Sequence, residues 1–408
     1  MSTAAAGSPA FRRVNRAMLA GGFSAFALLY TVQPLMPVLS TEFALTPTQS
    51  SWSLSISTLA MACSLILSGV LSERIGRKKL MVWALAGAAV FTLMSAFSRS
   101  FTELLVLRAV LGVALGGMPA VAMAYLKEEV EPRSLGLVMG MYIGGTALGG
   151  MAGRVLASLI AEHYSWRIAM ALMGAAGLYA AWEFWRCLPL SRHFTPGDVK
   201  PGKALWLAQV QGARAHLHDD GLPWLFALGF LLMGVFVSLY NYIGYRLMDA
   251  PFGLGQSAIG AMSVLYLVGM FSAVWAGRLA DRLGRRRVLW MVMALMLAGL
   301  LLTLSNALVL IVAGMALFTF GFFATHSVAS SWVGMRARAP QALAAALYLF
   351  FYYMGSSVIG SLCGLAWSAG GWPAVVALLA AALGAAILIT LRLRSLAPLA
   401  PLPPLPSA

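Results

Sequence analysis

The segment from Gly69 to Lys79 reads GVLSERIGRKK, and the segment from Gly277 to Arg287 reads GRLADRLGRRR. Both follow one pattern. An acidic residue stands four positions after the first glycine and is followed directly by an arginine. A second glycine then precedes three basic residues. Gly277 follows Gly69 by 208 residues, close to half of the 408-residue chain. This spacing indicates that one structural unit was duplicated in parallel orientation.

Other matches support the duplication. Tyr142-Ile-Gly144 corresponds to Tyr353-Met-Gly355 at an offset of 211 residues, and Trp166 corresponds to Trp372 at an offset of 206. Several matches in nearly the same register are not expected by chance. The duplicated unit therefore covers about half of the chain.

The composition places most of this chain in lipid. Hydrophobic residues make up 61% and charged residues only 10%, with a mean hydropathy of +0.84. These values exclude an ordinary water-soluble enzyme, a disordered protein and a nucleic-acid-binding domain. Apolar runs of spanning length predict twelve transmembrane helices. The predicted spans are 17–39, 51–71, 80–97, 103–126, 136–158, 167–186, 223–243, 259–279, 288–305, 307–330, 343–367 and 373–392.

The distribution of charge predicts the domains and their orientation. With the N-terminus inside, 23 of the 28 Lys and Arg residues lie on the cytoplasmic side, three on the opposite side (Arg99, Arg167 and Arg246) and two within spans (Arg108 and Arg154). This asymmetry predicts a multi-pass protein of the bacterial inner membrane with both termini cytoplasmic. It also explains the net charge of +15 by the lipid bilayer, without nucleic acid. The predicted divisions are a cytoplasmic N-terminus (1–16), a six-helix bundle (17–186), a cytoplasmic linker (187–222), a second six-helix bundle (223–392) and a cytoplasmic Pro-rich tail (393–408).

The repeated loop resembles the signature loop of the major facilitator superfamily. The resemblance implies an all-α membrane protein with about twelve transmembrane helices in two six-helix bundles, related by a pseudo-twofold repeat. It also implies that the loops latch the halves together on the cytoplasmic side, with Glu73 against the start of the eleventh span and Asp281 against the start of the fifth. The implied latch residues are Gly69, Glu73, Arg74, Gly76, Arg77, Gly277, Asp281, Arg282, Gly284 and Arg285. Basic loops that only follow the orientation rule are the alternative.

Two further patterns resemble motifs of this superfamily. Leu104, Arg108 and Gly112 resemble the fourth-helix motif, whose arginine takes part in coupling proton and substrate movements. A buried arginine needs a partner or a watery cavity, and hydrogen bonds to backbone carbonyls are the structural alternative.

Gly145, Gly149 and Gly153 resemble the fifth-helix motif of the antiporters, and this spacing favours close packing of a neighbouring helix. The family pattern has a proline where this chain has Gly150 and a glycine where it has Arg154, so a kink in this helix is not assured.

The first and seventh spans carry polar residues at equivalent places. Tyr30-Thr-Val-Gln33-Pro34 and Tyr240-Asn241-Tyr242 resemble a bacterial branch of the superfamily that is often labelled YnfM-like or arabinose-efflux-permease-like. We expect Tyr30, Gln33, Asn241 and Tyr242 to line a central cavity. Tyr142 and Arg154 of the fifth span are further candidates for substrate binding or coupling.

All 13 Asp and Glu residues lie in loops or near span ends, so no carboxylate lies deep in a span. Exporters of cations commonly keep one there, and coupling here must use another group. His326 in the tenth span is the main titratable candidate. Arg108 and Arg154, without internal counter-charges, suit an anionic or hydroxylated substrate.

Metal and cofactor signatures are absent from the sequence. The three cysteines lie far apart, and His216, His218, Asp219 and Asp220 in the linker are read as a solvated loop. The chain has no P-loop, HExxH or GxSxG motif. We therefore predict no cofactor, no metal and no enzymatic activity, and a monomer that uses a proton or solute gradient.

These observations predict a secondary transporter that works by alternating access. Proton-coupled efflux of a small organic compound is the preferred function, with a drug, a sugar or an organic anion as substrate. A proton-coupled importer or a facilitator has the same architecture, so direction of flux and proton dependence distinguish them. A receptor that binds without transport is the third reading, and an integral-membrane enzyme would need clustered polar residues that this sequence lacks.

Overall fold

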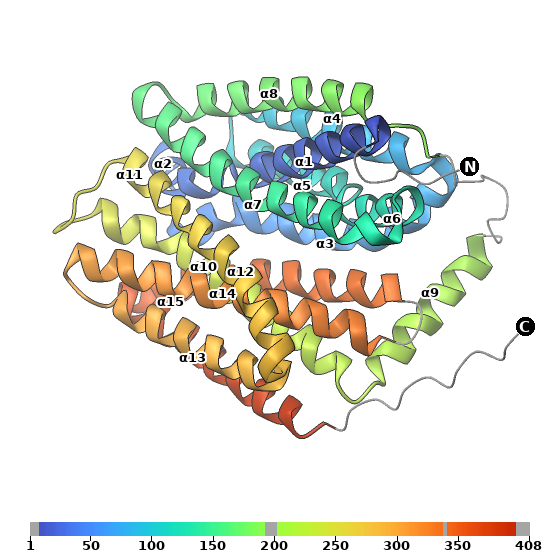
Figure 1. Ribbon diagram of the computed structural model, residues 1–408. Coiled ribbons are helices and arrows are strands. Elements are labelled where there is room, and N and C mark those ends of the chain that lie inside the picture. Colours follow the sequence, from blue (N-terminus) through green and yellow to red (C-terminus); the bar gives the residue numbers. More distant parts are fainter. Residues whose placement is uncertain (1–7, 192–201, 338–340, 397–408) are drawn as a thin grey trace, which may run out of the picture.

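The computed structural model describes residues 8–191, 202–337 and 341–396. The described residues form helices and no β-strand. Figure 1 shows them in two groups, α1 to α8 in one and α10 to α15 in the other. The helices of the first group are α1 (Pro9–Tyr30), α2 (Met36–Glu42), α3 (Pro47–Ile75), α4 (Arg77–Ser95), α5 (Phe101–Leu115), α6 (Pro119–Glu129), α7 (Pro132–His163) and α8 (Trp166–Cys187), with the 3₁₀ turn η1 (Gln33–Leu35) between α1 and α2.

The second group follows α9 (Gly202–Leu217), which belongs to the predicted linker. Its helices are α10 (Leu222–Met248), α11 (Gln256–Ala261), α12 (Tyr266–Leu283), α13 (Arg285–Leu302), α14 (Leu308–Arg336) and α15 (Gln341–Arg394), with the 3₁₀ turn η2 (Met262–Leu265) between α11 and α12. We call the end of the molecule where α1 and α10 begin the linker end, and the end that carries α2 and α11 the far end (Figure 1).

Ten helical stretches within the described residues are long and apolar enough to cross a membrane. One of them contains most of α15, which joins the predicted eleventh and twelfth spans. The backbone of α15 leaves the helical region at Gly370 and Gly371, so residues 341–369 and 372–394 form two arms. The predicted ninth span corresponds to α13, which begins with three arginines. The described helices therefore account for the two sets of six predicted spans.

Three predicted spans are interrupted: the eighth, expected over 259–279, is broken by η2 at Met262–Leu265, and the first and fourth are broken for evident local reasons. The first was expected over 17–39, but α1 ends at Tyr30, because Pro34 and Pro37 provide no amide hydrogen for a continuing helix. The fourth was expected over 103–126, but Gly116 and Gly117 separate α5 from α6, which starts at Pro119. Both breaks free backbone groups inside the bundle.

The repeated loop has the same backbone conformation in both halves. Gly76 ends α3 and begins α4 with φ 101°, and Gly284 ends α12 and begins α13 with φ 86°. Residues with a Cβ atom rarely adopt this positive range of φ, so the turn requires glycine at the second glycine position of the motif. The first glycines, Gly69 and Gly277, have open space where a Cβ atom would lie.

We expect Gly76→Ala and Gly284→Ala each to destabilise the protein by about 1–2 kcal/mol, because alanine is strained at positive φ. Gly69→Ala is the matched control, since that position has neither positive φ nor a close neighbour. Thermal unfolding of the purified variants in one detergent measures the effect. Equal melting temperatures for Gly69→Ala and Gly76→Ala would contradict the prediction.

Candidate functional site

A hydrogen-bonded network of three buried side chains connects the two halves. Arg154 of α7 donates from Nε to Oε1 of Gln33 at 2.5 Å, and Gln33 donates from Nε2 to Oδ1 of Asn241 at 2.6 Å. Each of the three is only 2% exposed. Gln33 follows the break in α1, and Asn241 lies exactly one repeat offset of 208 residues later, in α10. Equivalent positions of a two-fold repeat meet near its axis, so this pair lies where the halves face each other.

Aromatic rings enclose the guanidinium of Arg154. Its central carbon lies 4.0 Å from the ring centre of Tyr30 and 4.9 Å from that of Tyr266. Nη1 donates to the carbonyl of Gly150 at 2.6 Å. A Cβ atom on residue 150 would lie 3.1 Å from Nη1, so the glycine leaves room for the guanidinium. The two departures from the family motif, Gly150 and Arg154, are therefore parts of one arrangement.

Arg108 has a different environment, although it is also fully buried. Its guanidinium donates to the carbonyls of Leu28 at 3.2 Å and Leu29 at 2.5 Å in the last turn of α1, and to that of Ser53 in α3 at 3.2 Å. Carbonyls in a last helical turn lack partners within the helix and lie at the negative end of its dipole. In this structure Arg108 therefore caps α1 where the chain breaks, as in the structural alternative.

His326 lies in an aromatic cluster of the second half. Its Nδ1 is 3.0 Å from the hydroxyl of Tyr348, and its ring centre is 4.7 Å from that of Tyr352. Ring contacts lead from His326 through Phe322 and Phe236 to Tyr266, which contacts Arg154. We call His326, Phe322, Phe236 and Tyr266 the aromatic wall. Sequence reasoning missed Tyr266, because no motif marks it among the apolar residues of its span.

The remaining cavity candidates, Tyr142 and Tyr242, are buried but make no hydrogen bond to Arg154, Gln33 or Asn241 among the described residues. The hydroxyl of Tyr142 is buried and has no partner among the described residues. Tyr242 donates its hydroxyl to the carbonyl of Gly360 in α15 at 2.9 Å, and it also contacts Ser51 of α3 in the other half.

The four glycines singled out for helix packing in the sequence all lie at close helix contacts. A Cβ atom on Gly145, Gly149 or Gly153 would overlap the backbone of α1 at Leu19, Phe23 or Ala27, and one on Gly112 would overlap Ser57 of α3. The stripe on α7 thus holds α1 at close distance. This contact places Gln33 and Tyr30 next to Arg154.

Serine and threonine side chains form a second contact between the halves. Thr58 of α3 and Ser357 of α15 have hydroxyl oxygens 2.9 Å apart, and Ser357 lies 2.8 Å from the carbonyl of Ser55. The sequence gives a signal for this contact, since six of the nine residues from 50 to 58 are serine or threonine, a pattern unusual in a spanning helix. Small hydroxyl residues let two helices approach closely and bond across the contact.

The halves are also joined at the far end. Gln256 of α11 donates to the carbonyl of Pro34 at 2.5 Å, the hydroxyls of Ser40 and Tyr245 are 2.8 Å apart, and the amide of Ser257 donates to Glu162 at 2.6 Å. Glu162, at the end of α7, thus binds the start of α11. It is a carboxylate at a helix end receiving a neighbouring backbone N–H, the kind of latch that the sequence suggested for Glu73 and Asp281.

The described contacts of the predicted latch residues at the linker end lie within one half. Asp281 pairs with Arg285 of the neighbouring helix α13 at 3.2 Å, and the Glu73 carboxylate has no hydrogen-bond partner among the described residues. Arg77 pairs with Glu128 at 2.8 Å within the first half, while Arg74 and Arg282 are exposed. No hydrogen bond between two described residues links the halves at this end. In this structure Glu162 joins the halves, and Asp281 pairs within its own half.

Removing the far-end latch is expected to change the balance of conformations. Glu162→Ala deletes a charge-assisted hydrogen bond between the halves, and because Glu162 is exposed we expect a shift of about two- to fivefold toward a state closed at the linker end. Glu103→Ala is the control, because Glu103 accepts from the amide of Arg99 within one half. Spin-label distances between cysteines introduced at Arg74 and Arg282, without the native cysteines, measure the shift. Identical distance distributions for the two variants would contradict the prediction.

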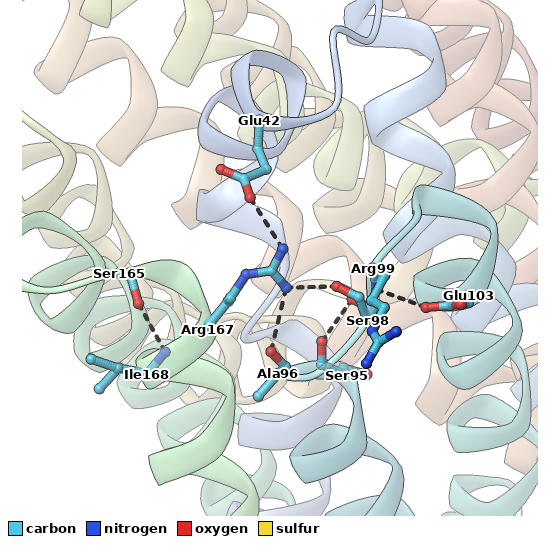
Figure 2. A network of polar contacts seen from close by, with 9 residues as sticks. All are labelled: Glu42, Ser95, Ala96, Ser98, Arg99, Glu103, Ser165, Arg167 and Ile168. Carbon is cyan, nitrogen blue, oxygen red and sulfur yellow. Dashed lines mark hydrogen bonds and ion pairs between the residues drawn. The ribbon is translucent and has the colours of Figure 1, made fainter.

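Arginines stabilise the far end within each half. Figure 2 shows Arg167 of α8 donating to Ser98 O at 2.6 Å beyond the end of α4 and pairing with Glu42 of α2 at 3.1 Å. In the second half Arg246 donates to the carbonyls of Thr303 and Ser305 beyond α13. Arg167 and Arg246 are two of the three basic residues predicted on the side opposite the linker, and these contacts give a structural reason for both.

Asp219 fixes the start of the second half. It accepts from Arg336 of α14 at 2.5 Å and from the amides of Gly221 and Leu222 at 2.8 Å each. Burial raises the pKa of Asp219, but the Arg336 hydrogen bond and the two amides together outweigh burial and hold the pKa below its ordinary value. The linker residue is therefore part of the folded second half.

A lowered folded-state pKa has a defined consequence for pH dependence. The stability from Asp219 is present above the ordinary Asp pKa and is lost as the pH falls through the lowered folded-state value. We expect Asp219→Asn to lower the melting temperature at neutral pH and to reduce its loss on acidification. Thermal unfolding at a series of pH values, with Asp220→Asn as control, tests this expectation. Parallel curves for wild type and Asp219→Asn would contradict it.

Comparisons with known proteins agree on one family. Residues 18–249 match the model of the Major Facilitator Superfamily. The chain is 48% identical to the uncharacterized MFS-type transporter YybF of Bacillus subtilis, over 91% of both chains. It is also 48% identical to the inner membrane transport protein YnfM of Escherichia coli, over 95% of this chain and 92% of that one. The nucleoside transporter NupG has the same fold, with a TM-score of 0.76 at 14% identity over 93% of this chain and 99% of that one.

Proposed function

This chain belongs to the major facilitator superfamily and is a secondary transporter rather than an enzyme, and on that premise we propose that it exports a small organic compound in exchange for protons. The two moving halves are residues 17–186 and 223–392, and the transport site lies between them. The site consists of Tyr30, Gln33, Arg154 and Asn241. The membrane is the bacterial inner membrane, with the linker end and both termini in the cytoplasm.

The buried hydrogen-bonded network of Arg154, Gln33 and Asn241 carries this proposal. Polar and charged groups are costly inside a membrane protein, and they mark substrate or ion pathways. The hydrogen bond between Gln33 and Asn241 crosses from one half to the other at equivalent positions of the repeat, where transporters of this architecture place their substrates. Movement of the halves must alter it, so binding at Arg154 is coupled to the contact between Gln33 and Asn241.

The arrangement of contacts supports loading from the cytoplasm. Hydrogen bonds join the halves at the centre and the far end, whereas the described linker-end residues do not join them. With the linker end in the cytoplasm, as the positive-inside rule requires, this is an inward-facing state. An exporter takes up its cargo in that state. Glu73 and Asp281 then form their latches in the outward-facing state.

His326 is the proposed proton carrier. His326 is the only histidine within a predicted span, and no carboxylate lies deep in one. Its hydrogen bond to Tyr348 and its place in the aromatic wall connect it to Tyr266 beside Arg154. Protonation of His326 and binding of substrate at Arg154 would thus occur on one continuous set of contacts.

A pH-sensitive dye in acid-loaded inside-out vesicles tests the function. We expect one class among cationic drugs, sugars and organic anions to alkalinise the lumen, and His326→Gln to remove this signal while labelled substrate still crosses. Arg99→Gln, an exposed arginine outside the site, is the control. Flux of a labelled solute without any pH signal in the wild type would reject proton exchange and favour a facilitator. Proton-driven accumulation in right-side-out vesicles would instead identify an importer.

A further inference from the structure

We propose that the substrate is an organic anion with a flat aromatic body, whose carboxylate pairs with Arg154. This inference rests on the proposed transport site and specifies its substrate class. It depends on three features of that site: the charge of Arg154, the direction of the hydrogen bonds around it, and the rings beside it.

The charge of Arg154 has no counter-ion in the part of the chain that the structure describes. The side chain is 2% exposed, and its two hydrogen bonds go to a neutral amide and a carbonyl. A buried charge without a partner is costly, and a ligand of opposite charge removes that cost. Arg108 does not offer the same opportunity, because three carbonyls, two of them at the negative end of α1, already surround it.

The hydrogen-bond directions leave donors unmatched. A guanidinium can only donate, so the atom of Gln33 that faces Arg154 must be Oε1. Gln33 therefore presents its amide nitrogen to Asn241, and the atom of Asn241 that receives it must be Oδ1. Nδ2 of Asn241 is left as a buried donor without a partner.

Two further groups beside Arg154 are also unmatched. Arg154 donates to described residues from Nε and Nη1 but not from Nη2. The hydroxyl of Tyr266, whose ring contacts the guanidinium, is buried without a partner. Nη2 and Asn241 Nδ2 can only donate, and the hydroxyl can donate as well. A ligand that satisfies this set must supply acceptors. A carboxylate does so with its negative charge, whereas an ammonium group offers only donors.

The rings define the rest of the ligand. The guanidinium lies on the face of Tyr30, and the aromatic wall extends from Tyr266 through Phe236, which stacks on Phe322 with 3.6 Å between ring centres. Such a wall favours a planar apolar group over the hydroxyls of a sugar. An aromatic carboxylate places its charge at Arg154 and its ring along the aromatic wall.

Binding of three ring-matched probes to the purified full-length protein tests the proposal. Naphthoate, naphthamide and naphthylmethylammonium share one ring system and differ in charge. We expect wild-type protein in lipid nanodiscs, at neutral pH, to bind naphthoate at least about tenfold more tightly than either of the others. Arg154→Gln should remove this preference, and Arg99→Gln should keep it. Titration calorimetry gives the three affinities without any gradient.

The outcomes are separable from those of the transport assay. Equal or tighter binding of the amide or the ammonium probe by the wild type, or no binding of naphthoate, would overturn the anionic substrate class even if proton exchange is observed. The wild-type comparison needs no variant, so it holds if Arg154→Gln fails to fold. Tight binding of naphthoate without proton exchange would support the anion site and reject proton-coupled export.

Discussion

Arg108→Met is expected to destabilise the protein by about 3–5 kcal/mol. The arginine satisfies the carbonyls of Leu28, Leu29 and Ser53 in a region without exposure to solvent. Methionine fills similar volume but leaves these acceptors unpaired, and each buried unsatisfied carbonyl costs about 1–3 kcal/mol. The end of α1 also loses the positive charge that faces its dipole.

Thermal unfolding followed by tryptophan fluorescence in one detergent measures this effect. Arg99→Met is the matched control, because it removes an exposed arginine. Arg108→Lys should retain part of the stability, since an ammonium group can bond some of the carbonyls but cannot match the guanidinium geometry. An unchanged melting temperature with loss of transport in Arg108→Met would assign Arg108 to coupling and reject its structural role.

Arg154→Met is expected to have the opposite combination of effects. It removes a buried charge that lacks a counter-ion among the described residues, so the melting temperature should equal or exceed that of the wild type. Transport should fall at least about thirtyfold, because truncating one partner of a buried charge pair costs about 2 kcal/mol or more. Two buried arginines of one half are thus predicted to differ in kind, one holding the fold and the other binding the substrate.

Melting temperature and initial flux of the same preparation test this contrast. Flux of the substrate found in the vesicle assay is measured in proteoliposomes with equal protein content. Thr92→Val serves as the control for a lost polar group in the core, since its buried hydroxyl donates to the carbonyl of Ala88 within α4. Undiminished flux in Arg154→Met would remove this arginine from the transport site.

The sequence predicted the architecture because each signal for it is local. Apolar runs, basic residues at their ends and a glycine at the turn are read from a few neighbouring residues, and Gly76 and Gly284 take the required positive φ. The interruptions at Pro34 and Gly116 were missed as breaks, although proline and paired glycines were visible. The predicted spans follow the hydropathy of the segments, and a helix that breaks at a proline or at paired glycines inside a bundle remains just as apolar.

The repeat could also have predicted one contact of the site. Gln33 and Asn241 were selected as separate cavity residues, but their separation of 208 residues equals the offset of the repeated loop. Polar residues at equivalent positions of two facing helices are candidates for a direct bond at the axis. The contact of Arg154 with Gln33 has no such signal, because it depends on how closely the glycines of α7 bring α1.

The sequence by itself determined the membrane class, the duplication and the candidate residues, because hydropathy, charge and glycine conformation act over short segments. Only the tertiary structure decided which buried arginine caps a helix and which is left without a counter-ion, since both read alike in apolar spans. It also decided that Glu162 joins the halves in this structure, while Asp281 pairs with Arg285 of its own half. That choice depends on the packing of two whole bundles, which local sequence does not encode.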